Sequence, residues 1–165
     1  MKKSIRTAAL IAIALAAAAA VAQTDAQKAF ASIKSMPGTW EGKDSSGKPL
    51  EVMFKVVSNG SAIMSEILVP NEDMISMIHL DGPNRLLLTH YCGAGNQPRM
   101  QASVSPDGKT ITFDYVDATN LASPDAGRMQ RMILTLVDDT HHTEEWTFLA
   151  HGKEQKVLFD LRRKS

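Results

Sequence analysis

The chain has 165 residues, of which 44% are hydrophobic and 22% charged, and its 18 Lys and Arg equal its 18 Asp and Glu in number. This length suits one domain with its own core, and the lack of a basic excess argues against a nucleic-acid-binding protein. Cys92 is the only cysteine. An internal disulfide is therefore excluded, and core packing must stabilise the fold.

The N-terminus has the residue order of a secretory signal peptide. Three basic residues lie within positions 2–6, and an unbroken apolar stretch follows at 8–22, ending in small residues. The stretch is shorter than the roughly 20 residues that span a bilayer. We expect cleavage after Ala22, no membrane span, and a mature single domain at 23–165 in the periplasm or outside the cell. That domain keeps 15 basic and 18 acidic residues and is close to neutral.

A short amphipathic helix is predicted at 25–35. Thr24 and Gln27 have the spacing of a capping box, and Pro37-Gly38 ends the pattern. The apolar residues recur at helical spacing, at Ala26, Ala29, Phe30 and Ile33.

After Gly38 the hydrophobic pattern has a period of two. Segments of strand length alternate with turn signals such as Asp81-Gly82-Pro83-Asn84. The two longest gaps between segments are at 93–98 and 118–126. The predicted strands cover residues 38–43, 50–57, 61–68, 74–80, 85–92, 99–105, 109–117, 127–137, 141–149 and 153–161.

Many short strands joined mostly by tight turns predict an all-β, antiparallel up-and-down meander of about 8–10 strands. Such a meander must protect its edge strands, and closure into a barrel does so. A two-sheet sandwich is the alternative, but its crossovers need longer connections than most of these gaps provide. The closed barrel, preceded by the short helix, is the favoured fold.

Two short stretches resemble the calycin group of lipocalin, fatty-acid-binding and nitrobindin-like barrels. They are Gly38-Thr39-Trp40-Glu41-Gly42 on the first strand and Phe159-Asp160-Leu161-Arg162-Arg163 on the last. The resemblance is greatest to the secreted lipocalin-like proteins of bacteria. It implies that Trp40 closes the barrel floor, with Arg162 or Arg163 packed on its ring by a cation–π contact. Arg163 has the parity of the apolar residues of its strand.

Polar residues that share parity with apolar ones are candidates for a binding pocket inside the barrel. His142 and Glu144 alternate with Trp146 on one face of their strand, Glu66 shares a face with apolar residues of the third strand, and His90 does so in the fifth. We expect these five residues to line a pocket. The alternative is that these residues pair with neighbouring polar side chains near the mouth of the barrel, or that a bulge shifts the alternation of inward and outward side chains by one residue.

The two long gaps carry amide side chains. Asn96 and Gln97 lie in the first gap and Asn120 lies in the second. These residues are predicted either to form a lid that contacts a ligand or to cap ordinary connecting turns.

No catalytic motif and no metal-binding spacing is present. His141-His142 and Glu144-Glu145 are close in sequence, but neighbours on a strand face opposite sides, so we assign no metal site. The resemblance to nitrobindin-like barrels implies a haem alternative, in which His90 or His142 is the proximal ligand.

These observations favour an exported, non-enzymatic carrier of a small, largely apolar molecule. The alternatives are a haem or metal protein, an enzyme that uses a His and Glu acid–base pair, and a partner protein without a cavity. Leu87 is predicted to point outward and needs a cover, which the helix or the second subunit of a homodimer could provide.

Overall fold

The computed structural model describes residues 22–69 and 72–165. Residues 1–21, which contain nearly all of the predicted signal peptide, lie outside the described residues. Within the described ranges, no helix has the length and apolar character needed to cross a bilayer.

Helix α1 (Asp25–Lys34) begins at the predicted capping box. The Thr24 hydroxyl accepts a hydrogen bond from the backbone N–H of Gln27, and the Gln27 side chain accepts one from the backbone N–H of Thr24. Both donors would otherwise lack partners at the start of the helix. The face of α1 that carries Ala29, Phe30 and Ile33 is buried in the core.

The rest of the described chain forms ten antiparallel strands and one short 3₁₀ turn, η1 (Ser58–Gly60). Their bounds agree with the predicted segments to within about two residues. The strands are β1 (Gly38–Asp44), β2 (Pro49–Val57), β3 (Ala62–Val69), β4 (Glu72–Leu80), β5 (Leu86–Tyr91), β6 (Gln97–Val104), β7 (Thr110–Thr119), β8 (Arg128–Asp138), β9 (His141–Ala150) and β10 (Lys153–Arg163).

The strands close into one barrel, in which each strand pairs with its neighbours in sequence and β1 also pairs with β10. This confirms the predicted barrel and excludes the sandwich. The pairing of β1 with β10 is the seam that closes the barrel. Trp40 lies at this seam, opposite Arg163 on β10 and opposite Val52 on β2. Gly42 is required at the same seam, since a Cβ atom there would lie 1.8 Å from the backbone oxygen of Asp160.

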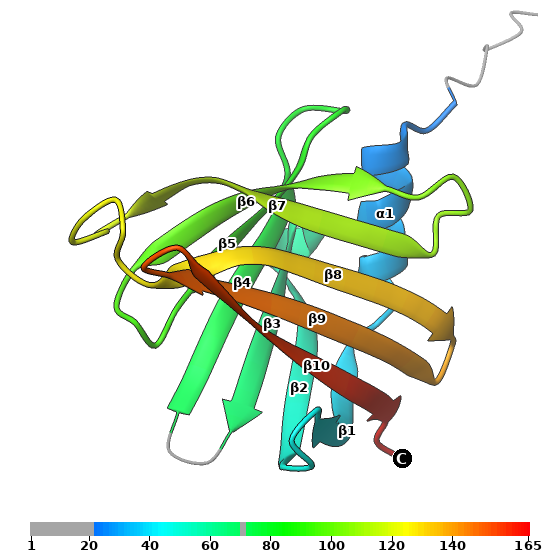
Figure 1. The fold of residues 1–165 in the computed structure, drawn as a ribbon. Coiled ribbons are helices and arrows are strands. Elements are labelled where there is room, and N and C mark those ends of the chain that lie inside the picture. Colours follow the sequence, from blue (N-terminus) through cyan, green and yellow to red (C-terminus); the bar gives the residue numbers. More distant parts are fainter. Residues whose placement is uncertain (1–21, 70–71) are drawn as a thin grey trace, which may run out of the picture.

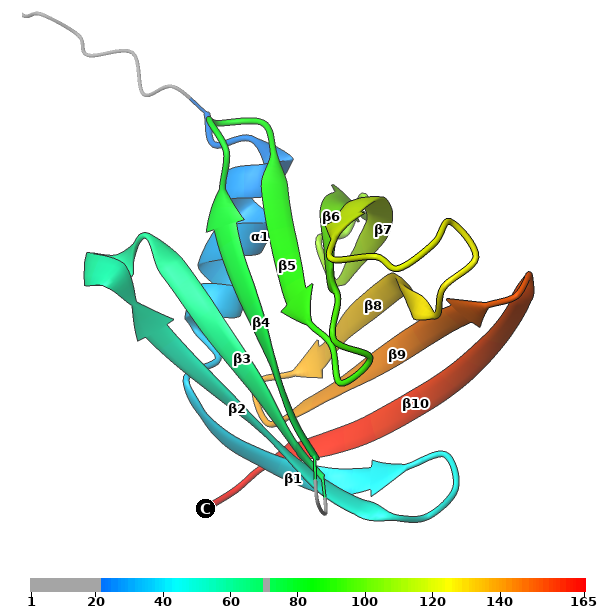
Figure 2. The same cartoon turned by 90° about the vertical axis from the view of Figure 1, so that its left-hand side faces the viewer.

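Helix α1 lies across one end of the barrel (Figures 1 and 2), where it contacts β4, β5 and β6. The Thr24 hydroxyl donates to the backbone oxygen of Pro83 in the β4–β5 turn, and the Lys34 ammonium donates to that of Gly60 between β2 and β3, at 2.9 Å. In Figure 1 the β6–β7 and β8–β9 turns lie beside α1, whereas the β7–β8 and β9–β10 connections lie at the opposite end. We call these the helix end and the loop end.

Alternate side chains of each strand fill the barrel interior, as on β5, where Leu86, Leu88 and His90 are buried and the residues between them are not. Leu87 is half-buried between two of these. The ladder shifts register where β6 meets β7, between Arg99 and Met100, and at two places where β8 meets β9. Such bulges reset the alternation of inward and outward side chains.

Candidate functional site

The floor of the barrel, at the helix end, is built around Trp40. The guanidinium of Arg163 lies 4.3 Å from the centre of the indole ring, and its Nη1 donates to the backbone oxygen of Pro37 at 2.9 Å. The indole N–H of Trp40 donates to the backbone oxygen of Met36 at 3.0 Å. Arg162 has the opposite parity and lies exposed, level with Glu41 on β1. Arg163 is therefore the residue that stacks on the tryptophan.

Three interior side chains of β9 form a hydrogen-bonded chain. Glu144 accepts a hydrogen bond from the Trp146 indole N–H at 2.9 Å, and its other oxygen lies 3.3 Å from Nε2 of His142. The side chains of His142 and Glu144 are each only 1% exposed. Residues two apart on a strand face the same side, which is why one strand supplies the whole chain.

His90 joins this chain from the other side of the barrel. Its ring centre lies 4.8 Å from that of Trp146, and its Nδ1 lies 3.0 Å from the Ser76 hydroxyl on β4. Its Nε2 is buried and has no hydrogen-bond partner among the described residues. Burial lowers the pKa of His90 from 6.5 to about 4, because the apolar surroundings disfavour the imidazolium ion. His90 is therefore neutral at physiological pH.

These contacts make one polar path through an otherwise apolar core. It runs from Ser76 and His90, past Trp146 and Glu144, to His142. At its far end His142 packs edge-on against Trp40, with ring centres 4.4 Å apart, and against Phe54 at 5.7 Å. The structure thus brings together His90, His142, Glu144 and Trp146. Strand parity predicted that each of these side chains points inward, and the closure of the barrel places His90 beside Trp146.

Glu66 does not belong to this path, and the prediction that it points into the barrel is wrong. On β3 the buried residues are Ile63, Ser65 and Ile67, whereas Glu66 is only half-buried and faces outward. Both faces of this strand carry apolar side chains, which is why alternation alone assigned the wrong face.

Ser65 and Ser76 are interior polar residues that the sequence reasoning missed. They are direct partners across β3 and β4, and both are buried. The signal was present for Ser76, which alternates with Met74 and Ile78 in its strand. Serine occurs often in strands without any role in a site, so its hydroxyl alone does not indicate one. Here the Ser76 hydroxyl is the hydrogen-bond partner of the buried His90 imidazole.

The amide side chains at the loop end hold the two long connections together. Asn120 donates to the backbone oxygen of Gly95 at 2.6 Å, and Gln97 accepts from the Thr119 hydroxyl at 2.8 Å. Asn96 is buried, donates to the backbone oxygen of Gly127 at 2.8 Å, and leaves its own amide oxygen without a partner among the described residues. In this structure Asn96 and Asn120 therefore donate to backbone oxygens of the loops, and Gln97 bonds both to the Thr119 hydroxyl and to the backbone oxygen of Gly95.

On the side of His90 that faces the loop end, the interior side chains are apolar and only partly buried. Val69, Met74, Met129 and Val157 are half-buried and pack against the core cluster. Val157 lies opposite Trp146 across β9 and β10. The two methionines are flexible side chains that adapt to differently shaped neighbours. This part of the barrel has the character of a wall for an apolar ligand.

Within the described residues, no group of three or more His, Cys, Asp or Glu side chains is placed to hold a metal ion. For haem, the donor chemistry of His90 fits an axial ligand, because Ser76 holds Nδ1 and Nε2 is unpaired. His142 does not fit through Nε2, which lies against Glu144.

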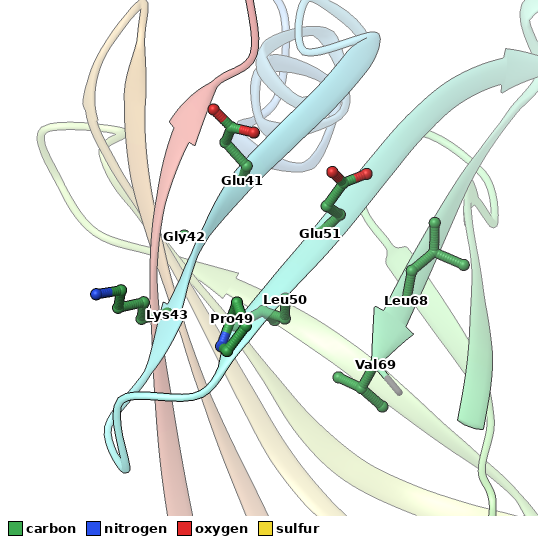
Figure 3. A pocket seen from close by; sticks show the side chains of 8 residues that line it. All are labelled: Glu41, Gly42, Lys43, Pro49, Leu50, Glu51, Leu68 and Val69. Carbon is green, nitrogen blue, oxygen red and sulfur yellow. The ribbon is translucent and has the colours of Figure 1, made fainter. Parts of the chain in front are cut away.

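Two clefts of about 550 Å³ each open outside this path. One lies over β1, β2 and β3 and is lined by Glu41, Glu51 and Leu68 among others (Figure 3). Its two carboxylates already share the ammonium of Lys164. The other lies at the helix end, and its lining includes His142. Only the second cleft borders the polar path.

No family model matches this chain, and no curated protein matches it. Among solved structures, the crystal structure of Rv2717c from M. tuberculosis is similar, with a TM-score of 0.56 and 16% sequence identity. The match covers 83% of this chain and 98% of that one. At this identity the likeness concerns the fold alone, and function must be argued from the site.

Proposed function

We propose that this protein is an exported, non-enzymatic binding protein that holds a small, largely apolar molecule inside the barrel, with a polar group of that molecule on His90. The observation that supports it most is the unpaired Nε2 of a fully buried, neutral imidazole. A buried polar atom without a partner costs about 1–3 kcal/mol. A ligand that carries a hydroxyl, amide or carbonyl group removes this cost when it bonds to Nε2.

The surroundings of His90 define the rest of the ligand. The half-buried apolar side chains toward the loop end include Met74 and Val157, and the Trp146 ring lies beside the imidazole. Burial of apolar surface stabilises a complex by about 25 cal/mol per Å². A ligand with one polar group and an apolar body therefore suits the site better than a sugar or a nucleotide.

Export is the part of the proposal that depends on the sequence alone. The basic and apolar segments at 2–6 and 8–22 support it. Expression of the full chain in a bacterial host, followed by fractionation and mass measurement, tests it. We expect a periplasmic product that begins at Gln23, and a full-length product in the cytoplasm would contradict export.

The binding function is tested on protein purified without refolding, by native mass spectrometry together with an absorbance scan. We expect a reproducible extra mass on the wild-type protein, lost on denaturation. His90→Phe removes both ring nitrogens but keeps an aromatic ring beside Trp146, so occupancy should fall at least about tenfold. His79→Phe is the matched control, because His79 is half-buried and faces outward on β4.

A bare mass for the wild type, together with no fluorescence response from the apolar probe N-phenylnaphthylamine, would overturn the proposal. An iron-porphyrin mass with a visible absorbance band would instead identify haem as the ligand. His90 is then the residue that would hold the iron, and the band should disappear in His90→Phe but persist in His79→Phe.

A further inference from the structure

The cleft at the helix end lies between the C-terminal end of α1 and the turn that joins β8 and β9 (Figure 1). Its volume of about 550 Å³ is within the range of about 300–1,000 Å³ typical of small-molecule sites. The exposed residues of its lining, such as Ser35 and Val137, form the rim. The buried residues Met36, Trp40 and His142 form the floor. The floor is therefore apolar except for one imidazole ring and one indole N–H.

One polar atom of this floor has no partner. The Nδ1 atom of His142 is buried and makes no hydrogen bond with the described residues. The Nε2 atom of the same ring lies 3.3 Å from Glu144, which is farther along β9 toward the loop end. Since the two nitrogens of an imidazole point in nearly opposite directions, Nδ1 is turned toward the helix end, where the cleft lies. The indole N–H of Trp40 already donates to the backbone oxygen of Met36, so Nδ1 is the floor atom left for a ligand.

The charged residues that line the cleft balance in number. They are two cations, Lys109 and Arg163, and two carboxylates, Asp138 and Asp139. Lys109 also interacts with the carboxylate of Asp107, just outside the lining. An ion that entered the cleft would lose hydration without a net attraction to replace it. The cleft is therefore suited to an uncharged molecule.

We propose that this cleft is a second binding site, which takes a small uncharged molecule with a hydroxyl group and a short alkyl body. The hydroxyl group bonds to Nδ1 of His142. Because a hydroxyl group can both donate and accept, it pairs with this nitrogen whether or not the nitrogen carries a hydrogen. The alkyl body lies against Met36, Trp40 and Leu136, which line the cleft. The site lies at the opposite end of the polar path from His90, so it does not depend on the ligand proposed for the barrel interior.

Three probes test the class of ligand: hexan-1-ol, hexanoate and hexylammonium. They share the alkyl chain and differ in the charge of the head group, and an NMR titration that follows the indole N–H signal of Trp40 compares them directly. We expect hexan-1-ol to bind at least about tenfold more tightly than either ion, because only the ions must give up the hydration of a charge.

The role of His142 is read from the same samples. Spectra that correlate the ring nitrogens of histidine with the ring hydrogens report the hydrogen bonding of each nitrogen separately. Hexan-1-ol should shift the Nδ1 signal of His142 and leave both nitrogen signals of His90 unchanged. No substitution of His142 is needed, which keeps Glu144 beside its partner in the core.

Two variants test the location. Val137 is 45% exposed and lines the cleft, so Val137→Trp should fill the cleft and weaken hexan-1-ol binding at least about tenfold. Val116→Trp is the matched control, because Val116 is 50% exposed on β7 and does not line the cleft. This variant should bind hexan-1-ol as the wild type does.

Each part of the proposal has its own contrary result. Binding of hexanoate or hexylammonium as tight as that of hexan-1-ol would overturn the uncharged class of ligand. Binding of hexan-1-ol without a shift of Nδ1 would overturn the role of His142. Unchanged binding in Val137→Trp would place the alcohol elsewhere in the barrel, and no shift of the Trp40 signal with any probe would overturn the site altogether.

Discussion

His90 should make the stability of the protein fall as the pH is lowered from about 6.5 to about 4. Burial lowers the pKa of His90 to about 4 in the folded protein, whereas the unfolded chain has the ordinary value of 6.5. Between these values the unfolded chain binds a proton that the folded protein does not bind. Protonation therefore favours unfolding, and the stabilisation present above pH 6.5 is lost as the pH falls through this window.

The magnitude follows from the width of the window. One pH unit corresponds to about 1.4 kcal/mol, so the 2.5 units between 6.5 and 4 amount to about 3–4 kcal/mol. His90→Gln removes the titrating group and should flatten the pH dependence of the free energy of unfolding by this amount. Urea titrations between about pH 7 and pH 4, followed by the fluorescence of the buried Trp40 and Trp146, measure it.

The control is His79→Gln, which makes the same substitution on the outward face of β4. Other groups titrate equally in His90→Gln and wild type, so the difference between their slopes isolates His90. If His90→Gln and the wild type lose stability in parallel between pH 6.5 and 4, the imidazole is not held neutral by burial, and the basis of the proposed interior site is refuted.

Three further substitutions test the closed end of the barrel, each by urea or thermal unfolding. Arg163→Lys loses the planar stack on Trp40 and should cost about 1–2 kcal/mol, whereas Arg162→Lys should change stability by less than about 0.5 kcal/mol; equal effects would contradict the stacking role. Gly42→Ala places a Cβ against the backbone oxygen of β10 and should cost more than about 3 kcal/mol, so a folded variant of near wild-type stability would disprove the close approach. Thr24→Ala removes the N-cap of α1 and should cost about 1 kcal/mol, and an unchanged melting temperature would show that the capping box does not stabilise the helix end.

Local signals in the sequence were sufficient to predict the helix, the strands and the three site residues that β9 carries. The capping box at Thr24 and the turn residues between the strands act over a few neighbouring residues, so their effect can be read without the fold. The alternation of His142, Glu144 and Trp146 is equally local, because a single strand carries all three. The choice of Arg163 over Arg162 followed from the same parity.

The alternation of side chains did not predict the inward face correctly where a strand is apolar on both faces. Glu66 has Met64 and Leu68 on its own face, and Ile63 and Ile67 on the other. Only the pairing of β3 with its neighbours decides which of these faces points inward, and it places Ser65 beside Ser76. The bulge between Arg99 and Met100 likewise depends on the partner strand.

The sequence by itself determined the class of fold, the order and length of the strands, and which residues of β9 share a face, because each depends on hydrophobic period and turn chemistry over short distances. The tertiary structure decided that His90 meets Trp146 from across the barrel and that His142 borders a cleft lined in part by the C-terminal end of α1. It also decided that two imidazoles each retain an unpaired nitrogen. Contacts between strands far apart in the chain are set by the closure and register of the whole barrel, which no local pattern encodes.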